Sequence, residues 1–245
     1  MCTVVDGVPV ARAGPVRIRR QQLRAKVEAL LALQVGAVHD VDWMLEFVVP
    51  QGLMGEPFEE WHIREPGAAR PQPMRTVPVV VRHVDRLKPL RVSWLTRKRW
   101  ETLRARGETR PVPVACSLAY DYDDFYDWLD DKDDVCVLAY AANPVDDWLA
   151  AALDIGVPVM LWRRLDCVGA GHEACAPTAF LDRLTREVAG YDPDRLPYEV
   201  MRLRKAARSP QRGGADHCGH RLTLFWDDPE RRPDPPLAMG GKGSD

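Results

Sequence analysis

The sequence lacks the long apolar segment that a membrane-spanning helix requires. Its longest uninterrupted apolar run, from Val135 to Ala142, is far shorter than the ~20 residues that cross a bilayer. Met1 is followed by neither the basic nor the apolar stretch that opens a secretory leader. We therefore expect a cytoplasmic protein.

A strong excess of charge of either sign is also missing. The 245 residues include 34 lysines and arginines against 36 aspartates and glutamates, which gives a formal net charge of −2. No overall field therefore draws the chain to nucleic acid or to an anionic membrane. Local basic patches are not excluded, so nucleic-acid binding through two basic helices, near residues 15–31 and 197–208, remains an alternative that predicts salt-dependent binding.

Cysteine is too scarce for a fold held by disulfides, with 6 in the whole chain. Cys116 and Cys136 lie inside apolar runs, where a thiol packs as a small hydrophobic group. This usage suits a reducing compartment. Other cysteines and histidines fall in two glycine-rich segments, as Cys167, His172 and Cys175 and as His217, Cys218 and His220. They form no paired C-x-x-C motif, so we expect neither a metal ion nor another cofactor.

Motifs for nucleophilic or nucleotide chemistry are missing as well. Ser117 has no G-x-S-x-G surroundings, and Cys116 lies within an apolar run rather than at a helix N-terminus. There is no G-x-x-x-x-G-K-[ST] loop, and Gly169-Ala-Gly171 is too short for a dinucleotide fingerprint. These absences argue against ATP hydrolysis by this chain, and no catalytic residue is assigned.

The chain does contain a repeated alternation of short apolar strands and helical stretches, which is typical of α/β folds. The clearest strand lies in Gly156-Val-Pro-Val-Met-Leu-Trp-Arg-Arg164, which is apolar on both alternating faces. Before it, Asn143-Pro-Val-Asp-Asp147 predicts a helix start with an amide N-cap and two carboxylates facing the helix dipole. A further strand at residues 135–141 completes a strand, helix, strand unit. Such a unit implies a parallel pair with a right-handed crossover.

We therefore expect a mostly parallel sheet of five to six strands with helices on both faces, plus a short N-terminal hairpin around Asp6-Gly7. The other strands are expected at residues 43–49, 77–84, 112–119 and 222–226. The corresponding division of the chain is a hairpin at residues 1–14, an α/β domain at 15–229 and a disordered tail at 230–245.

Two of the expected helices are rich in arginine. The helix at residues 87–106 is expected to turn Trp94 toward the core and Arg99 toward solvent. The helix that begins near Pro197 is expected to expose Arg204, as charged residues on a helix usually are.

Ligands of open parallel sheets bind outside the carboxyl ends of the strands. The polar residues expected near such ends are our candidates for ligand or partner binding: Arg82, Asp85, Arg163, Arg164, Asp227 and Asp228. We look first where the strands at residues 156–164 and 222–226 end. Carboxylates at such a place suit Mg²⁺, and arginines suit a phosphate or carboxylate. The resulting alternative is a metal-dependent phosphoesterase or nuclease, which needs Asp227 or Asp228 close to a carboxylate such as Asp85 or Asp121.

Several motifs follow one another in a distinctive order between residues 41 and 232. They are Pro50 to Trp61 with Glu56-Pro-Phe-Glu-Glu-Trp61, Pro78-Val-Val-Val-Arg-His83 with Arg86, the pair Trp94 and Trp100, Gly156 to Arg164, the helix from Leu196 to Ala207, and Leu222-Thr-Leu-Phe-Trp-Asp-Asp-Pro229. Together they resemble the C-terminal domain of vWA-MoxR-associated proteins, the VMAP-C family of bacterial NTP-dependent conflict systems.

The resemblance implies a non-catalytic adaptor or interaction module in defence. Members are thought to work with a MoxR-type AAA+ ATPase and a von Willebrand A protein, linking sensing to an effector, and no catalytic residues carry over. Relatives have further domains before this one, so we expect a separate preceding module or a minimal form of the protein. An adaptor of this kind predicts exposed apolar or aromatic surface near Met54, Phe58 and Trp61, or on the basic first helix.

Overall fold

The structure is a computed structural model that describes most of the chain. The described residues are 2–5, 8–12, 19–35, 43–65, 67–88, 91–115, 120–165, 177–209, 211 and 217–231. At the N-terminus β1 (Cys2–Val5) and β2 (Val8–Arg12) pair in antiparallel fashion, which confirms the predicted hairpin. The Asp6-Gly7 turn itself lies outside the described residues.

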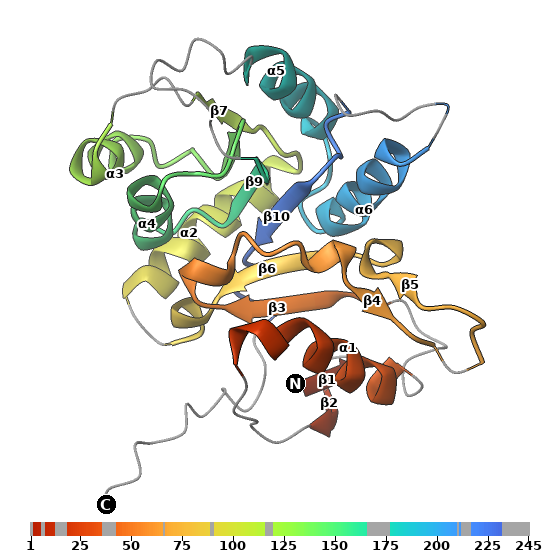
Figure 1. The fold of residues 1–245 in the computed structure, drawn as a ribbon. Coiled ribbons are helices and arrows are strands. Elements are labelled where there is room, and N and C mark those ends of the chain that lie inside the picture. Colours follow the sequence, from red (N-terminus) through yellow and green to blue (C-terminus); the bar gives the residue numbers. More distant parts are fainter. Residues whose placement is uncertain are drawn as a thin grey trace, which may run out of the picture.

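A six-stranded sheet forms the centre of the α/β domain (Figure 1). Its order is β3 (Leu45–Val49), β6 (Val79–His83), β10 (Leu222–Trp226), β9 (Val159–Arg163), β8 (Val137–Tyr140) and β7 (Val112–Val114). Every neighbouring pair is parallel except β10 and β9. This confirms the predicted α/β fold with a mostly parallel sheet, and β8 and β9 are the parallel pair that the strand, helix, strand unit implied.

The antiparallel pairing of β10 with β9 divides the sheet into two parallel halves that run in opposite directions. Leu222 lies opposite Arg163, and Trp226 lies opposite Val159. We call the edge where β3, β6 and β10 end the Asp227 edge, and the edge where β9, β8 and β7 end the Arg164 edge. The strands that end at residues 163 and 226 therefore open onto opposite edges, because β10 runs back along β9.

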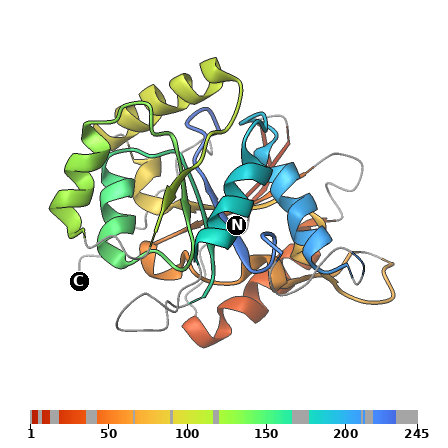
Figure 2. The same cartoon turned by 90° about the horizontal axis from the view of Figure 1, so that it is seen from above.

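Helices cover both faces of the sheet (Figure 2). One face packs against α1 (Leu23–Gln34), α3 (Tyr122–Asp130) and α4 (Asp146–Asp154), and the other against α2 (Arg91–Arg106), α5 (Pro177–Val188) and α6 (Leu196–Ala207). The strands serve both cores by alternation, since Met160 and Trp162 of β9 face the first group while Val159 and Leu161 face the second. The prediction that the apolar run within residues 156–164 forms a strand buried between two layers is confirmed.

The segment between β3 and β6 forms short elements that close one core. They are η3 (Gln51–Leu53), η4 (Phe58–Glu60), β4 (His62–Ile63), β5 (Gln72–Pro73) and η5 (Met74–Thr76). Phe58 stacks on Phe47 with ring centroids 4.0 Å apart, and Trp61 meets Phe58 edge-on at 4.8 Å. Met54, Phe58 and Trp61 are all buried, so the expected partner surface at these residues is wrong. Leu33 of α1 is exposed, which leaves the first helix as a candidate surface.

The start of α4 differs from its prediction. The helix begins at Asp146 with Val145 as N-cap, rather than with Asn143. The reason is that the Asn143 backbone N–H donates to the Leu165 carbonyl at 2.9 Å, which keeps this part of the chain alongside the exit of β9. In α3, by contrast, an aspartate caps the helix: Asp121 accepts a hydrogen bond from the backbone N–H three residues on.

The inward face of α2 was also predicted incorrectly. Its buried residues are Thr96, Arg99, Trp100 and Leu103. Trp94 lies outside this stripe and is 62% exposed, whereas Arg99 is buried. Arg204 of α6 is buried too, because it donates hydrogen bonds to backbone carbonyls at the starts of β6 and β10.

Glycine is required in the turn from α4 into β9. Gly156 has a φ of +87°, which favours a residue without a side chain. An added Cβ would lie 2.7 Å from the backbone nitrogen of Thr96, so α2 packs directly against this turn.

Several predictions fall on residues that the structure leaves out. Cys167, His172 and Cys175, the strand residues 116–119 and the tail beyond residue 231 all lie outside the described residues. Within the described residues, no helix combines the length and the apolar character that crossing a membrane requires.

Candidate functional site

The Asp227 edge holds a buried network of two arginines and one aspartate. Arg82, the last residue but one of β6, donates from Nε and Nη2 to Asp227 Oδ1 at 3.0 and 2.8 Å. Arg86, in η6 (Val84–Leu87), donates from Nη1 to Asp227 Oδ2 at 3.2 Å. All three side chains are at most 4% exposed. Both carboxylate oxygens of Asp227 are therefore occupied by buried guanidinium groups.

Arg82 also joins two further segments to this network. It donates to Glu46 Oε2 at 3.1 Å, to the Asp228 carbonyl at 2.9 Å and to the Arg231 carbonyl. Burial lowers the pKa of Arg82, but the carboxylates of Asp227 and Glu46 outweigh burial and raise that pKa above its usual value. Burial raises the pKa of the Asp228 carboxyl, which accepts a hydrogen bond from the backbone two residues on.

Arg86 connects the network to the end of α4. Its Nη2 donates to the carbonyls of Ala152 and Leu153 at 3.0 and 2.6 Å, and its Nη1 donates to the Val157 carbonyl at 3.0 Å. Carbonyls in the last turn of a helix have no partner within that helix, and a cation there is also favoured by the helix dipole. Arg86 therefore fixes α4 to the Asp227 edge.

The carboxylates that a metal-dependent nuclease would use as metal ligands have other partners in this structure. Asp85 is half exposed and is paired with Lys88, while Asp121 caps α3. Asp227 is held by two guanidinium groups, as described above. Among the residues that the structure describes, no group of three or more histidine, cysteine, aspartate or glutamate side chains is arranged to hold a metal ion.

A second charged cluster lies at the Arg164 edge. Arg164 follows β9, and its Nη1 donates to Glu59 Oε2 at 3.0 Å and to Thr223 Oγ1 at 2.9 Å, while its Nη2 contacts the other Glu59 oxygen. This two-point guanidinium–carboxylate contact is nearly buried, with the side chains 8% and 6% exposed. The neighbouring Arg163 lies over the Phe180 ring at 5.3 Å from its centroid.

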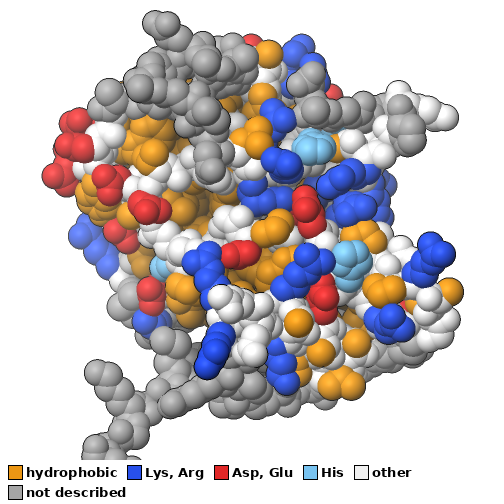
Figure 3. Space-filling model, viewed as in Figure 1, with side chains coloured by type: hydrophobic (Ala, Val, Ile, Leu, Met, Phe, Trp, Pro, Cys, Tyr) orange, Lys and Arg blue, Asp and Glu red, His pale blue; other side chains and the backbone are white. Residues whose placement is uncertain are grey.

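An open hollow of about 410 Å³ lies beside the Arg164 pair, and we call it the Arg164 hollow. It is lined by Gly55, Pro57, Glu60, Asn143, Arg164, Leu165 and Arg221. Figure 3 shows lysine and arginine side chains gathered near a histidine in the region of β10 and α6.

Arginines from separate elements approach His220 at this edge. Burial lowers the pKa of the His220 imidazole, and the positive charges of Arg208, Arg221 and Arg163 lower it further, against an opposing effect of Glu60. A lowered pKa keeps this histidine neutral at pH 7. The positive charge around His220 therefore comes from the arginines and not from the imidazole.

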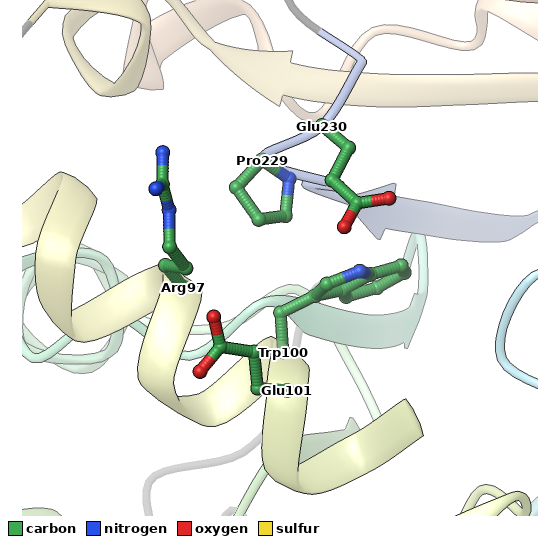
Figure 4. A pocket seen from close by; sticks show the side chains of 5 residues that line it. All are labelled: Arg97, Trp100, Glu101, Pro229 and Glu230. Atoms are coloured by element: carbon green, nitrogen blue, oxygen red, sulfur yellow. The ribbon is translucent and has the colours of Figure 1, made fainter. Parts of the chain in front are cut away.

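A smaller pocket of about 180 Å³ lies at the Asp227 edge, between α2 and the chain after β10. Arg97, Trp100 and Glu101 of α2 face Pro229 and Glu230 across it (Figure 4). Arg97, Glu101 and Glu230 line the pocket, and Glu230 is paired with Arg104, so two guanidinium groups balance the two carboxylates and the charge favours no ligand of either sign.

The six sequence candidates thus separate into three places. Arg82, Asp227 and Asp228 meet at the Asp227 edge, Arg163 and Arg164 lie at the opposite edge, and Asp85 is exposed beside Lys88. Sequence reasoning missed Arg86, Glu59 and Arg221 as site residues, although the first two lie within the motifs quoted above. Glu59 and Arg86 contact residues far away along the chain, so spacing carried no signal for them.

Comparison with known families adds one finding. The family model described as vWA-MoxR associated protein C-terminal domain, VMAP-C, matches residues 3–229. The match covers nearly the whole chain and both edges of the sheet. No curated protein and no solved structure is significantly similar to the chain.

Proposed function

Because the chain belongs to the family of vWA-MoxR associated protein C-terminal domains, we propose that it is a non-catalytic adaptor in a bacterial conflict or defence system. The family name indicates an association with vWA and MoxR proteins. In this proposal the chain binds a MoxR-type AAA+ ATPase and a von Willebrand A protein in the cytoplasm, and it transmits their state to an effector.

The family match over residues 3–229 carries the proposal. The ion pairs of the carboxylates at the strand ends also support it. Asp227 already accepts hydrogen bonds from Arg82 and Arg86, and Glu59 already pairs with Arg164. These carboxylates hold the fold together, which favours a binding module over a hydrolase that needs them for metal ions.

Affinity purification of the tagged full chain from the bacterium that encodes it tests the adaptor role. We expect mass spectrometry to recover an AAA+ ATPase and a von Willebrand A protein, and the tagged ATPase to recover this chain in the reverse experiment. A tagged unrelated protein of similar charge serves as control. Recovery of neither partner in both directions contradicts the proposal.

A further inference from the structure

The Arg164 hollow contains an arginine in a backbone conformation that L-residues avoid. Arg221 has a φ of 54°, and among the described residues it is the non-glycine residue with a positive φ. In this left-handed region the Cβ crowds the backbone, so glycine is the usual choice. A strained residue of this kind points to a role for its side chain.

The neighbouring turn holds Arg221 in this conformation. The His220 N–H donates to the His217 carbonyl at 2.9 Å, and the Gly219 N–H donates to His217 Nδ1 at 3.0 Å. Gly219 packs so closely on α6 that an added Cβ would lie 2.1 Å from the Leu203 carbonyl oxygen. The turn has no room to shift toward α6, and at a φ of 54° the backbone at position 221 suits glycine better than arginine.

Contacts of the Arg221 side chain within the protein do not explain why an arginine stands at this position. Arg164 is paired with Glu59, and Arg208 lies 3.5 Å from Glu60. Arg221 lines the hollow, and its exposed side chain makes no hydrogen bond or ion pair with the described part of the chain. The arginine side chain therefore contributes nothing to the fold that offsets its backbone strain.

The charges around the hollow favour an anion. The groups concerned are the guanidinium groups of Arg164, Arg208 and Arg221 and the carboxylates of Glu59 and Glu60. Three positive charges against two negative charges leave an excess of one, because His220 is neutral. An anion in the hollow therefore meets a net attractive field.

We propose that the Arg164 hollow binds a carboxylate side chain from an acidic segment of a protein partner, with Arg221 as its main contact. Carboxylates already pair with two arginines here, since Glu59 contacts Arg164 and Glu60 lies 3.5 Å from Arg208. Glu60 lines the hollow and leaves an excess of one positive charge, which a single carboxylate balances and a doubly charged phosphate exceeds. The identity of the ligand as a protein rests on the proposed adaptor function.

Binding of a fluorescein-labelled hexaglutamate peptide, followed by anisotropy at low salt, tests this site directly. We expect Arg221→Gly to weaken binding about tenfold, because a charged contact is lost. Glu60→Gln is expected to tighten binding several-fold, since it removes the competing internal carboxylate. Arg97→Ala is the matched control, because it removes an arginine from the opposite edge, and its affinity is expected to stay within about twofold of the wild type.

Two results overturn the carboxylate site. One is wild-type peptide affinity in Arg221→Gly. The other is displacement of the peptide by inorganic phosphate at a concentration at which glutarate leaves it bound, because this ranks phosphate above carboxylate. Thermal unfolding separates binding from folding: relief of the positive φ is expected to raise the melting temperature of Arg221→Gly. A lower melting temperature for this variant contradicts the backbone argument.

Affinity purification with Arg221→Gly distinguishes this inference from the adaptor function. Recovery of the ATPase and the von Willebrand A protein by both wild type and variant supports the adaptor and refutes the hollow as its contact. If neither protein is recovered while hexaglutamate binds through Arg221, the adaptor proposal fails and the carboxylate site stands. Loss of partner capture in the variant alone supports both.

Discussion

Replacement of Arg86 by methionine tests how far the buried network at the Asp227 edge stabilises the domain. Methionine keeps most of the length and apolar volume of the side chain but removes its charge and all its donors. Arg86 makes five hydrogen bonds, one of them to Asp227 and three to backbone carbonyls beside α4. The substitution leaves these acceptors buried without their donor.

The expected loss follows from these contacts. Removing one partner of a buried ion pair costs about 3–5 kcal/mol. Asp227 keeps Arg82, so we expect the lower end, about 3 kcal/mol. A domain is stable by only about 5–15 kcal/mol. At about 2–4 °C per kcal/mol for a chain of this size, the melting temperature of Arg86→Met is expected to fall by roughly 6–12 °C.

Urea unfolding followed by tryptophan fluorescence measures the free energy of unfolding, and thermal unfolding followed by circular dichroism measures the melting temperature. Arg104→Met is the matched control. Arg104 lies on α2 with its side chain 43% exposed and pairs with Asp194 and Glu230. An exposed pair of this kind contributes about 0–1 kcal/mol. If Arg86→Met destabilises the protein no more than Arg104→Met does, the network is not what fixes α4.

Three further predictions concern single positions. Gly156→Ala is expected to lower the free energy of unfolding by about 3 kcal/mol, because the residue has a positive φ and its added Cβ would contact Thr96. Urea unfolding measures this loss, and a value below about 1 kcal/mol would contradict this reasoning. Burial raises the pKa of the Cys136 and Cys218 thiols to about 11. Mass spectrometry should therefore find both cysteines unmodified by maleimide at pH 8 until urea unfolds the chain. Fast labelling of these two cysteines in the native protein would refute their burial. Burial lowers the pKa of His83 below its ordinary 6.5, so the unfolded chain binds this proton first and stability falls as the pH drops through 6.5 toward the folded-state pKa. His83→Gln should therefore lose less unfolding free energy than the wild type between pH 7 and pH 5.5, and an equal loss would show that His83 does not contribute.

The alternation of apolar runs was enough to predict the fold class and most strands. The run within residues 156–164 became β9, and its parallel pairing with β8 followed from the short helix between them. These features depend on hydrophobic periodicity and short connections, which are local in sequence. Local signals therefore describe each half of the sheet well.

The relation between the two halves could not be predicted in the same way. Nothing in the residues of β10 states whether it runs with β9 or against it, and that direction decides which strand ends meet. The candidates near strand ends could for this reason not be assigned to one edge or the other, and Arg163 and Arg164 lie at the opposite edge of the sheet from Asp227 and Asp228.

Buried arginines were the other source of error. A periodicity argument treats arginine as a solvent-facing residue, so Arg99 and Arg204 were assigned to helix surfaces. Arg99 donates to the carbonyls of Leu129 and Val135, whose positions 30 and 36 residues away along the chain leave no trace in local spacing. Family resemblance was more informative than periodicity here, because Arg82 and Asp227 both lie within the quoted motifs and form one contact 145 residues apart.

The central place of β10 has a consequence for how the protein is made on the ribosome. β10 is the last of the six strands to be synthesised, yet it lies between β6 and β9. The pair β3–β6 and the group β9–β8–β7 share no strand pairing until Leu222–Trp226 has been translated and has left the exit tunnel. Until then β6 and β9 each present an unpaired inner edge, which is a site for wrong pairing with another nascent chain. Co-translational folding should therefore yield two half-sheets that join in one late step, when the final strand arrives and brings Asp227 to Arg82.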